Sequence, residues 1–315
     1  MSVGTRETVG ALPARAGRVR RHGLFESGFP YLLILPAVTG ILLVILFPIF
    51  YNAWLSFHLR RLIIPQTPFV GMANYQRVLL DPEFWNAVWV TAVWAVGSIG
   101  LNFLVGLGMA LLLDLTFPGR SIFRIIFLVP WATPQIVAAM NWKWLLNDQF
   151  GLVNALLVQA GILSGAVAWL ADLHLALPIV ILINVWKNYG FEMMAFLAAL
   201  QSIPGVLYEA GSIDGASAVQ RFRYITLPLL RPIILVLIIL RSIWSINSFD
   251  MVYVLTSGGP ANATQLTSLY IFKTAFERGM FSASAAASML IFVVVLGLAL
   301  LFMRASARQG ATHAA

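Results

Sequence analysis

The feature that most constrains this chain is the recurrence of apolar runs, each long enough to cross a lipid bilayer. A hydrocarbon core of about 30 Å needs about 20 helical residues. Only helices and closed barrels satisfy their backbone polar groups in lipid, and these runs are too continuous for barrel strands. The sequence therefore predicts an all-α, polytopic membrane protein with six transmembrane helices. We place them at about residues 30–57, 85–113, 122–146, 174–200, 230–256 and 283–303.

The composition supports this class. Hydrophobic residues make up 60% of the 315 residues and charged residues 10%, whereas an ordinary soluble domain is about one quarter charged. The net charge of +8 comes from arginines that cluster at the ends of the apolar runs, where they set topology, so it does not indicate a nucleic-acid partner. The chain has no cysteine, which excludes disulfides and thiolate metal sites.

The orientation follows from the basic residues in the connections, because cytoplasmic loops are enriched in Lys and Arg. With the N-terminus inside, most of the 20 Lys and Arg residues fall on the cytoplasmic side. The first outer loop is an exception, since it carries Arg60, Arg61 and Arg77. We therefore expect both termini, and the loop over residues 201–229, to be cytoplasmic. The third run contains Pro130 and Pro134, so we expect a kinked helix there.

The chain organisation is simple. We expect a basic, disordered and uncleaved cytoplasmic tail over residues 1–28, a single membrane domain over 29–305, and a second cytoplasmic tail over 306–315. No internal repeat of 20–50 residues is visible in the sequence.

Several kinds of chemistry find no support in the sequence. It contains neither a phosphate-binding loop of the G-x-x-x-x-G-K-[ST] type nor a dinucleotide-binding glycine fingerprint. Its four histidines are scattered, and Asp250, the one aspartate near the interior of a span, has no second carboxylate beside it. We therefore expect no catalytic residue, no metal site and no cofactor, and we predict that the chain is not an enzyme.

Polar residues inside the fourth and fifth spans are more informative, because each is costly to bury in lipid. In both spans they recur at helical spacing, so that each set lies on one face. The set in the fourth span is Asn184, Lys187, Asn188 and Phe191. The set in the fifth is Arg241, Trp244, Ser245 and Ser248, with Asn247 and Asp250 close by. Amides, hydroxyls and aromatic faces suit a sugar-like solute. The alternative is that they only join the helices by hydrogen bonds.

A polar loop, Tyr208 to Pro228, interrupts the apolar chain. We expect a helix that starts near Pro204, with Val206, Leu207, Ala210 and Ile213 on one face, then a turn at Gly215. A second short helix, with Asp214 near its start, is expected to close at Leu227-Pro228. This helix-turn-helix either lies on lipid headgroups or contacts another protein, and its many small residues suit close protein contact.

The motif in this loop resembles a known family. Glu209-Ala210-Gly211, Gly215, and Ile225 with Leu227-Pro228 match the pattern E-A-A-x₃-G-x₉-I-x-L-P, with Gly211 in place of the third residue, usually Ala. This pattern resembles the coupling loop of binding-protein-dependent ABC importer permeases, in particular the carbohydrate-uptake branch. Further similarity runs over nearly the whole chain, from Phe69-Val70-Gly71 to Gly258-Gly259-Pro260.

The resemblance implies a transmembrane permease subunit of the bacterial or archaeal inner or plasma membrane. It implies a second permease subunit, two ABC ATPase subunits that hydrolyse ATP, and an extracytoplasmic binding protein that delivers a sugar or related polyol. The residues that it assigns to ATPase coupling are Glu209, Ala210, Gly211, Asp214, Gly215, Ala216, Gln220 and Phe222. An ion-coupled secondary transporter is the main alternative, and a non-transporting scaffold, which leaves the polar stripes unexplained, is a third.

Overall fold

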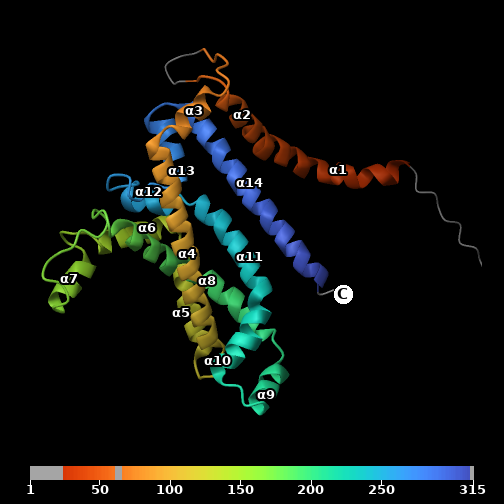
Figure 1. Ribbon diagram of the computed structural model, residues 1–315, viewed down its shortest axis with the longest axis vertical. Helices are drawn as coiled ribbons and strands as arrows, with labels where there is room; N and C mark the ends of the chain where they lie inside the picture. The colour runs from red at the N-terminus through yellow and green to blue at the C-terminus, as the bar shows by residue number, and fades with distance from the viewer. Residues whose placement is uncertain (1–23, 61–65, 313–315) are drawn as a thin grey trace, which may run out of the picture. The chain divides into compact units, whose positions relative to one another are not determined.

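The computed structural model describes residues 24–60 and 66–312, and the chain divides into two units, Met1–Tyr51 and Asn52–Ala315 (Figure 1). In the first unit, α1 (Leu24–Ile41) continues through a π-helical turn, η1 (Leu42–Leu46), into α2 (Phe47–Ser56), whose last residues belong to the second unit. Apolar side chains such as Leu43 and Val44 are largely exposed there, as expected for residues that contact lipid.

The second unit contains the remaining helices, two of which include a π-helical turn. Their bounds are α3 (Ala73–Leu79), α4 (Pro82–Asp114), α5 (Arg120–Ala132), α6 (Gln135–Leu145), α7 (Leu152–Gln159), α8 (Ala176–Gln201), α9 (Gly205–Ile213), α10 (Ala218–Arg221), η2 (Phe222–Thr226), α11 (Leu227–Ile246), α12 (Asp250–Thr256), α13 (Thr267–Phe272), η3 (Lys273–Glu277) and α14 (Phe281–Thr312). Figure 1 shows α3 and α13 at one end of this unit and α9 and α10 at the other.

The prediction of an all-α membrane protein is confirmed. Helices supply the regular structure of the described residues, apart from one isolated bridge between His58 and Phe69. Four helical segments are long and apolar enough to cross a membrane, and two bent pairs bring the number to six. One of these pairs is α8 with α9, but α8 alone has 26 residues, about 39 Å of helix, and can span by itself.

The third span differs from the expected kink. α5 and α6 meet at an angle of 91°, so residues 122–146 form a corner rather than a bent helix. Thr133 follows α5 in an extended conformation, with φ −68° and ψ 136°, which is the conformation that a residue before proline favours. Pro134 then caps α6, so the chain changes direction between the two residues.

The fifth span is also not one helix. The predicted run 230–256 breaks after Ile246, and a separate helix, α12, starts at Asp250. The Asn247 side chain donates to the carbonyl of Ile243, at 2.8 Å, and the Ser248 amide donates to the carbonyl of Ser245, at 3.2 Å. These bonds satisfy backbone groups at the end of α11, which makes the break tolerable at membrane depth.

The predicted helix end at Leu227-Pro228 is wrong, because helix continues from Ala218 to Ile246. Pro228 lacks the N–H that an α-helix needs. The π-helical turn η2 lies directly before it, and the Leu227 amide there donates to the carbonyl of Phe222, five residues earlier. Asp214 directly follows α9 as its C-cap and does not start the second helix, which is capped by Ser217 instead.

α4 and α8 form the most extensive helix pair of the second unit. Gly106 on α4 makes their close approach possible. A Cβ atom added there would lie 2.6 Å from the Cβ of Glu192 and 3.1 Å from the Met193 nitrogen, both on α8. The core around this contact is apolar and includes Ala110, Phe196 and Leu230. This pair is therefore the frame on which the other helices of the unit assemble.

Polar contacts tie the start of α4 to α13 and the turn after it. The Tyr270 hydroxyl donates to Asp81 at 2.7 Å, and Arg278 forms an ion pair with Glu83 at 2.5 Å. Gln265 also donates to Glu83, at 2.9 Å. Burial, and then the bond to Asp81, raises the pKa of the Tyr270 hydroxyl well above its ordinary value, while the bond to Glu83 raises the pKa of Arg278.

The expected tails are only partly described. Residues 1–23 and 313–315 lie outside the described residues. α1 starts at Leu24 and α14 runs to Thr312, so residues 24–28 and 306–312, which we assigned to tails, are helical.

Candidate functional site

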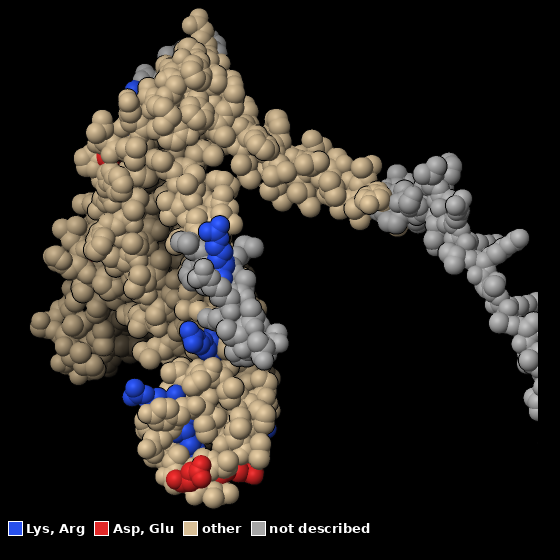
Figure 2. Space-filling model, turned by 45° about the vertical axis from the view of Figure 1, so that its right-hand side comes forward, with Lys and Arg blue, Asp and Glu red and all other residues tan. Residues whose placement is uncertain are grey.

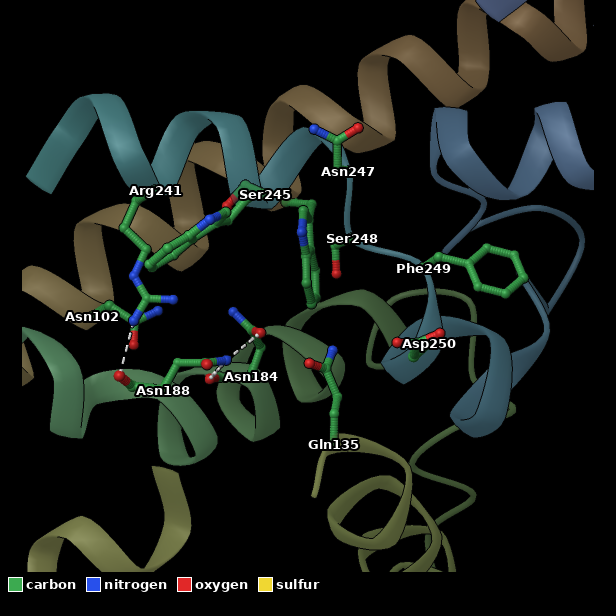
Figure 3. Close-up of a pocket in the computed structure, with 12 residues that line it drawn as sticks. Asn102, Gln135, Asn184, Asn188, Arg241, Ser245, Asn247, Ser248, Phe249 and Asp250 are labelled. Carbon is green, nitrogen blue, oxygen red and sulfur yellow. Dashed lines mark hydrogen bonds between the residues drawn. The ribbon is translucent and has the colours of Figure 1, made fainter. Parts of the chain in front are cut away.

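A cavity of 290 Å³ lies among α4, α6, α8 and α11 and the connection that leads into α12 (Figure 3). Its lining combines amides, hydroxyls, two ionic groups and aromatic rings. The lining residues are Trp94, Asn102, Gln135, Asn184, Asn188, Arg241, Trp244, Ser245, Asn247, Ser248, Phe249 and Asp250. All of the predicted pathway residues except Lys187 and Phe191 are among them, so the two polar stripes do meet in space.

The α8 stripe is divided between the cavity and the helix contacts. Asn184 and Asn188 line the cavity, and the Asn188 amide donates to both the backbone and side-chain oxygens of Asn184, at 2.9 and 2.8 Å. Lys187 points elsewhere, and its ammonium donates to the carbonyl of Trp131 at 2.8 Å, in the last turn of α5. Phe191 stacks at an angle on Trp244, with ring centres 5.4 Å apart.

The α11 stripe contains a buried ion pair that sequence reasoning missed. Arg241 donates through Nε and Nη2 to the two carboxylate oxygens of Glu192, and through Nη2 to the carbonyl of Asn188 at 2.9 Å. Glu192 is fully buried. The guanidinium also lies over the rings of Phe191 and Trp244, 5.6 and 5.4 Å from their centres. A usable signal existed, because Glu192 continues the spacing of Asn184 and Asn188 by four residues.

A third polar face, on α4, was also missed. Trp94, Ser98 and Asn102 recur every four residues and are each at most 1% exposed. Trp94 Nε1, Ser98 Oγ and Asn102 Oδ1 have no hydrogen-bonding partner among the described residues. Buried polar groups in proteins are nearly always paired with protein, water or ligand. Trp94 and Asn102 line the cavity, so this face adds an indole and an amide to its wall, with their unpartnered polar atoms enclosed.

The remaining polar side chains of the cavity come from the two helix breaks. Gln135 is the first residue of α6, directly after the 91° corner, and Figure 3 shows its side chain directed toward the cavity. Asn247, Ser248 and Asp250 come from the break between α11 and α12. Ser268 fixes this connection by donating to the carbonyl of Ser248. Irregular backbone at membrane depth is tolerated where it lines a cavity, and both breaks fit that rule.

The predicted coupling loop has the expected helix-turn-helix form. α9 ends at Ile213, and Gly215 turns the chain with φ +76°, which favours glycine. The next helix starts with a reciprocal cap, in which the Ser217 amide donates to Gln220 Oε1 at 2.7 Å and the Gln220 amide to Ser217 Oγ at 3.3 Å. The Tyr208 hydroxyl lies 2.9 Å from that of Thr226, which links the two arms.

The residues predicted to couple to an ATPase divide into exposed and structural ones. Glu209, Ala210, Asp214, Gly215 and Gln220 are exposed, and Gly211, Ala216 and Phe222 are half-buried. A Cβ atom at Gly211 would lie 3.1 Å from Cδ1 of Ile225, so Gly211 lets the arms approach closely. Apolar residues are exposed here too, with Val206 63%, Ile213 86% and Val219 74% exposed.

Charge gathers at the same end of the second unit. Figure 2 shows acidic side chains at its tip and basic ones further from the tip, above them in the view. The ionic residues of segment 201–231 are Glu209, Asp214, Arg221, Arg223 and Arg231. Arg221 donates to Ser212, which ties one of these cations into the loop. Across the described residues, 24–60 and 66–312, no group of three or more His, Cys, Asp or Glu side chains is placed to hold a metal ion.

Comparison with known proteins identifies the family. The profile of the family described as "Binding-protein-dependent transport system inner membrane component" matches residues 102–308. The trehalose/maltose transport system permease protein MalF of Thermococcus litoralis is 40% identical over 279 residues, which cover 89% of this chain and 94% of that protein. The inner membrane ABC transporter permease protein YcjO of Escherichia coli is 32% identical over 281 residues, 88% of this chain and 94% of YcjO.

A solved structure shares the fold. A chain from the crystal structure of a bacterial ABC transporter involved in the import of the acidic polysaccharide alginate superposes with a TM-score of 0.80 at 24% identity, over 90% of this chain and 96% of that one. The chain is thus a multi-pass inner membrane protein, and it belongs to the family of inner membrane components of binding-protein-dependent transport systems.

Proposed function

We propose that this permease forms half of the pathway by which a sugar or related polyol enters the cell, and that its loop over residues 201–229 couples that pathway to an ABC ATPase. The observation that carries the proposal is the cavity, which places amides, hydroxyls and the Trp244 ring between otherwise apolar helices. A sugar offers hydroxyls to the amides and an apolar ring face to an indole. The relative that handles trehalose and maltose supports the same class of solute.

The partners in this proposal follow from what the chain lacks and what it exposes. The sequence contains no phosphate-binding loop, so ATP hydrolysis is assigned to two partner ATPase subunits. The exposed apolar residues Val206, Ile213 and Val219, with Glu209 and Asp214, suit docking of the loop on such a subunit. A second permease subunit would complete the pathway, and an extracytoplasmic binding protein would deliver the solute. Both termini and the loop are then cytoplasmic.

The pathway is tested by replacing two cavity residues in the assembled transporter. Asn188→Leu removes an amide and Trp244→Ala removes a stacking surface, each worth about 1–3 kcal/mol of solute contact. We expect the apparent KM for uptake of trehalose or maltose into proteoliposomes to rise about tenfold for at least one variant. Trp89→Ala, an exposed tryptophan on α4 outside the cavity, is the control. If uptake is unaltered in both cavity variants, the polar stripes of α8 and α11 serve only as helix-to-helix contacts.

The coupling is tested by Glu209→Lys, which reverses the charge of an exposed loop residue. We expect the variant to insert and assemble, while ATP-driven uptake is lost. Asp148→Lys, which reverses an exposed carboxylate outside the loop, should transport normally. Normal transport by Glu209→Lys would contradict the assignment of the loop, and uptake driven by an ion gradient without any ATPase would favour a secondary transporter.

A further inference from the structure

Two ionic side chains line the cavity among the described residues, Arg241 and Asp250, and their surroundings differ sharply. Figure 3 shows them on opposite parts of the cavity wall, Arg241 from α11 and Asp250 from the start of α12. Two nearby lysines do not line it. Lys187 donates to the carbonyl of Trp131 and Lys143 to that of Val254, each at 2.8 Å. The ionic side chains that a solute in the cavity touches are therefore Arg241 and Asp250.

The positive charge of Arg241 is already neutralised. Its guanidinium donates to both carboxylate oxygens of Glu192, a side chain without solvent exposure, and to the carbonyl of Asn188. A bidentate pair of this kind is strong because both groups are held in register. An anionic solute would have to compete with a buried carboxylate that lies in direct contact. Arg241 can therefore help to orient a solute in the cavity, but it adds little attraction for an anion.

The negative charge of Asp250 has no such compensation. The side chain is exposed, and it has no hydrogen-bonding or ionic partner among the described residues. Asp250 is also the first residue of α12, where the helix end favours a negative charge and this carboxylate already supplies it. The cavity therefore presents one carboxylate that no cationic side chain among the described residues pairs.

We infer that this arrangement disfavours solutes that carry a carboxylate or phosphate, so that the pathway prefers the neutral member of a pair of otherwise similar sugars. The inference rests on the proposed function, since it requires that the cavity receives the solute. Repulsion between two carboxylates a few ångströms apart in a partly solvated cavity corresponds to a loss of affinity on the order of tenfold. Asp250 and Glu192 are then specificity-determining residues. Asp250 repels an anionic solute, and Glu192 pairs with Arg241 so that its guanidinium does not attract one.

The test measures binding to the assembled transporter in nanodiscs without its binding protein, because the binding protein would impose a selection of its own. The probes are two matched pairs, glucose with glucuronate and galactose with galacturonate, in which a carboxylate replaces the hydroxymethyl group and the ring is kept. Saturation-transfer NMR gives an affinity for each sugar. For the wild-type protein we expect each neutral sugar to bind at least about tenfold more tightly than its acid.

Single-residue variants test whether Asp250 and Glu192 cause the preference for the neutral sugar. Asp250→Asn keeps the size of an exposed side chain, and we expect it to reduce the neutral-to-acid ratio about tenfold. Glu192→Gln frees the charge of Arg241 and should lower the same ratio, with thermal unfolding recorded to confirm assembly. Asp148→Asn, an exposed carboxylate outside the cavity, should leave the ratio unchanged. Equal wild-type affinities for a sugar and its acid, or an unchanged ratio in Asp250→Asn, would overturn the inference. If no neutral sugar bound, the proposed function itself would fail.

Discussion

At the scale of single residues, the contact between Gly106 and Glu192 joins packing to the candidate site. The missing side chain at Gly106 lets α8 approach α4 so closely that Glu192 has no solvent exposure. A carboxylate buried that deeply must be paired, and Arg241 pairs it. The residue that fixes the guanidinium beside the cavity is therefore itself held in place by a glycine on a third helix.

The first prediction concerns this glycine. Gly106→Ala should destabilise the folded protein by about 1–3 kcal/mol, because the added methyl would overlap the Cβ of Glu192 and force α4 and α8 apart. Thermal unfolding in detergent, followed by tryptophan fluorescence, measures the change. Gly108→Ala is the matched control on the same helix, since apart from the adjacent backbone of α4 no atom lies within 4 Å of the added methyl. It should be neutral or slightly stabilising, and equal losses in both variants would refute the close contact as the cause.

At the scale of elements, interruptions of the helices carry the polar groups. Gln135 comes from the corner between α5 and α6, and Asn247, Ser248 and Asp250 come from the break after α11. The continuous helix from Ala218 to Ile246 has the opposite role, because it joins the loop to the cavity without a break. Its start depends on one cap, since Ser217 is the residue that accepts from the Gln220 amide.

The second prediction tests this cap. Ser217→Ala removes the side chain that accepts from the first turn, at a cost of about 1 kcal/mol, so amide exchange over residues 217–222 should accelerate roughly fivefold. Hydrogen–deuterium exchange followed by mass spectrometry measures it. Ser202→Ala, at the end of α8, removes a hydroxyl that bonds only to a carbonyl and should leave this peptide unchanged. Unchanged protection in Ser217→Ala would mean that the helix start is held by other contacts.

At the scale of the whole second unit, the polar functions are separated along its length. The network of Asp81, Glu83, Tyr270 and Arg278 holds the end that contains α3 and α13, the cavity lies further along α4, and the loop of α9 and α10 forms the opposite end (Figure 1). Such a separation allows each end to meet a different partner while the same helices run past the cavity.

The third prediction uses pH to test the first of these ends. The pKa of Tyr270 is raised in the folded state, so the hydroxyl keeps its proton at pH values where the unfolded chain, with a tyrosine pKa near 10, loses it. The stability from neutral Tyr270 is thus full below about pH 10 and is lost as the pH rises toward the folded-state pKa. Above pH 10 the wild type should lose stability up to about 1.4 kcal/mol per pH unit faster than Tyr270→Phe.

Thermal unfolding between pH 8 and 11.5 measures these slopes. Tyr224→Phe, which alters an exposed tyrosine, serves as the control and should keep the wild-type slope. Identical slopes in the wild type and Tyr270→Phe would contradict a buried, hydrogen-bonded hydroxyl. At neutral pH, Tyr270→Phe should cost about 1 kcal/mol through the lost bond to Asp81.

The sequence predicted the helical class and most of the cavity, because burial in lipid leaves strong hydropathy and spacing signals. It did not predict the helix breaks at Pro134 and Asn247, since hydropathy continues across both of them. At Pro134, only the backbone geometry distinguishes a corner between two helices from a kink within one helix. Glu192 and the α4 face of Trp94, Ser98 and Asn102 were missed because their polarity is diluted in long apolar runs, although both have helical spacing. Whether these residues touch a solute, and whether the loop couples to an ATPase, stay predictions.

The unbroken helix from Ala218 to Ile246 has a mechanical consequence. A helix rises about 1.5 Å per residue, so about 36 Å of helix, which includes the π-helical turn η2 and Pro232, separates Ser217 from Arg241. A tilt of about 5° pivoting at the cavity would sweep the loop end through roughly 3 Å. A tilt about this pivot would therefore displace the loop end far more than it displaces Arg241, whose ion pair with Glu192 lies near the pivot.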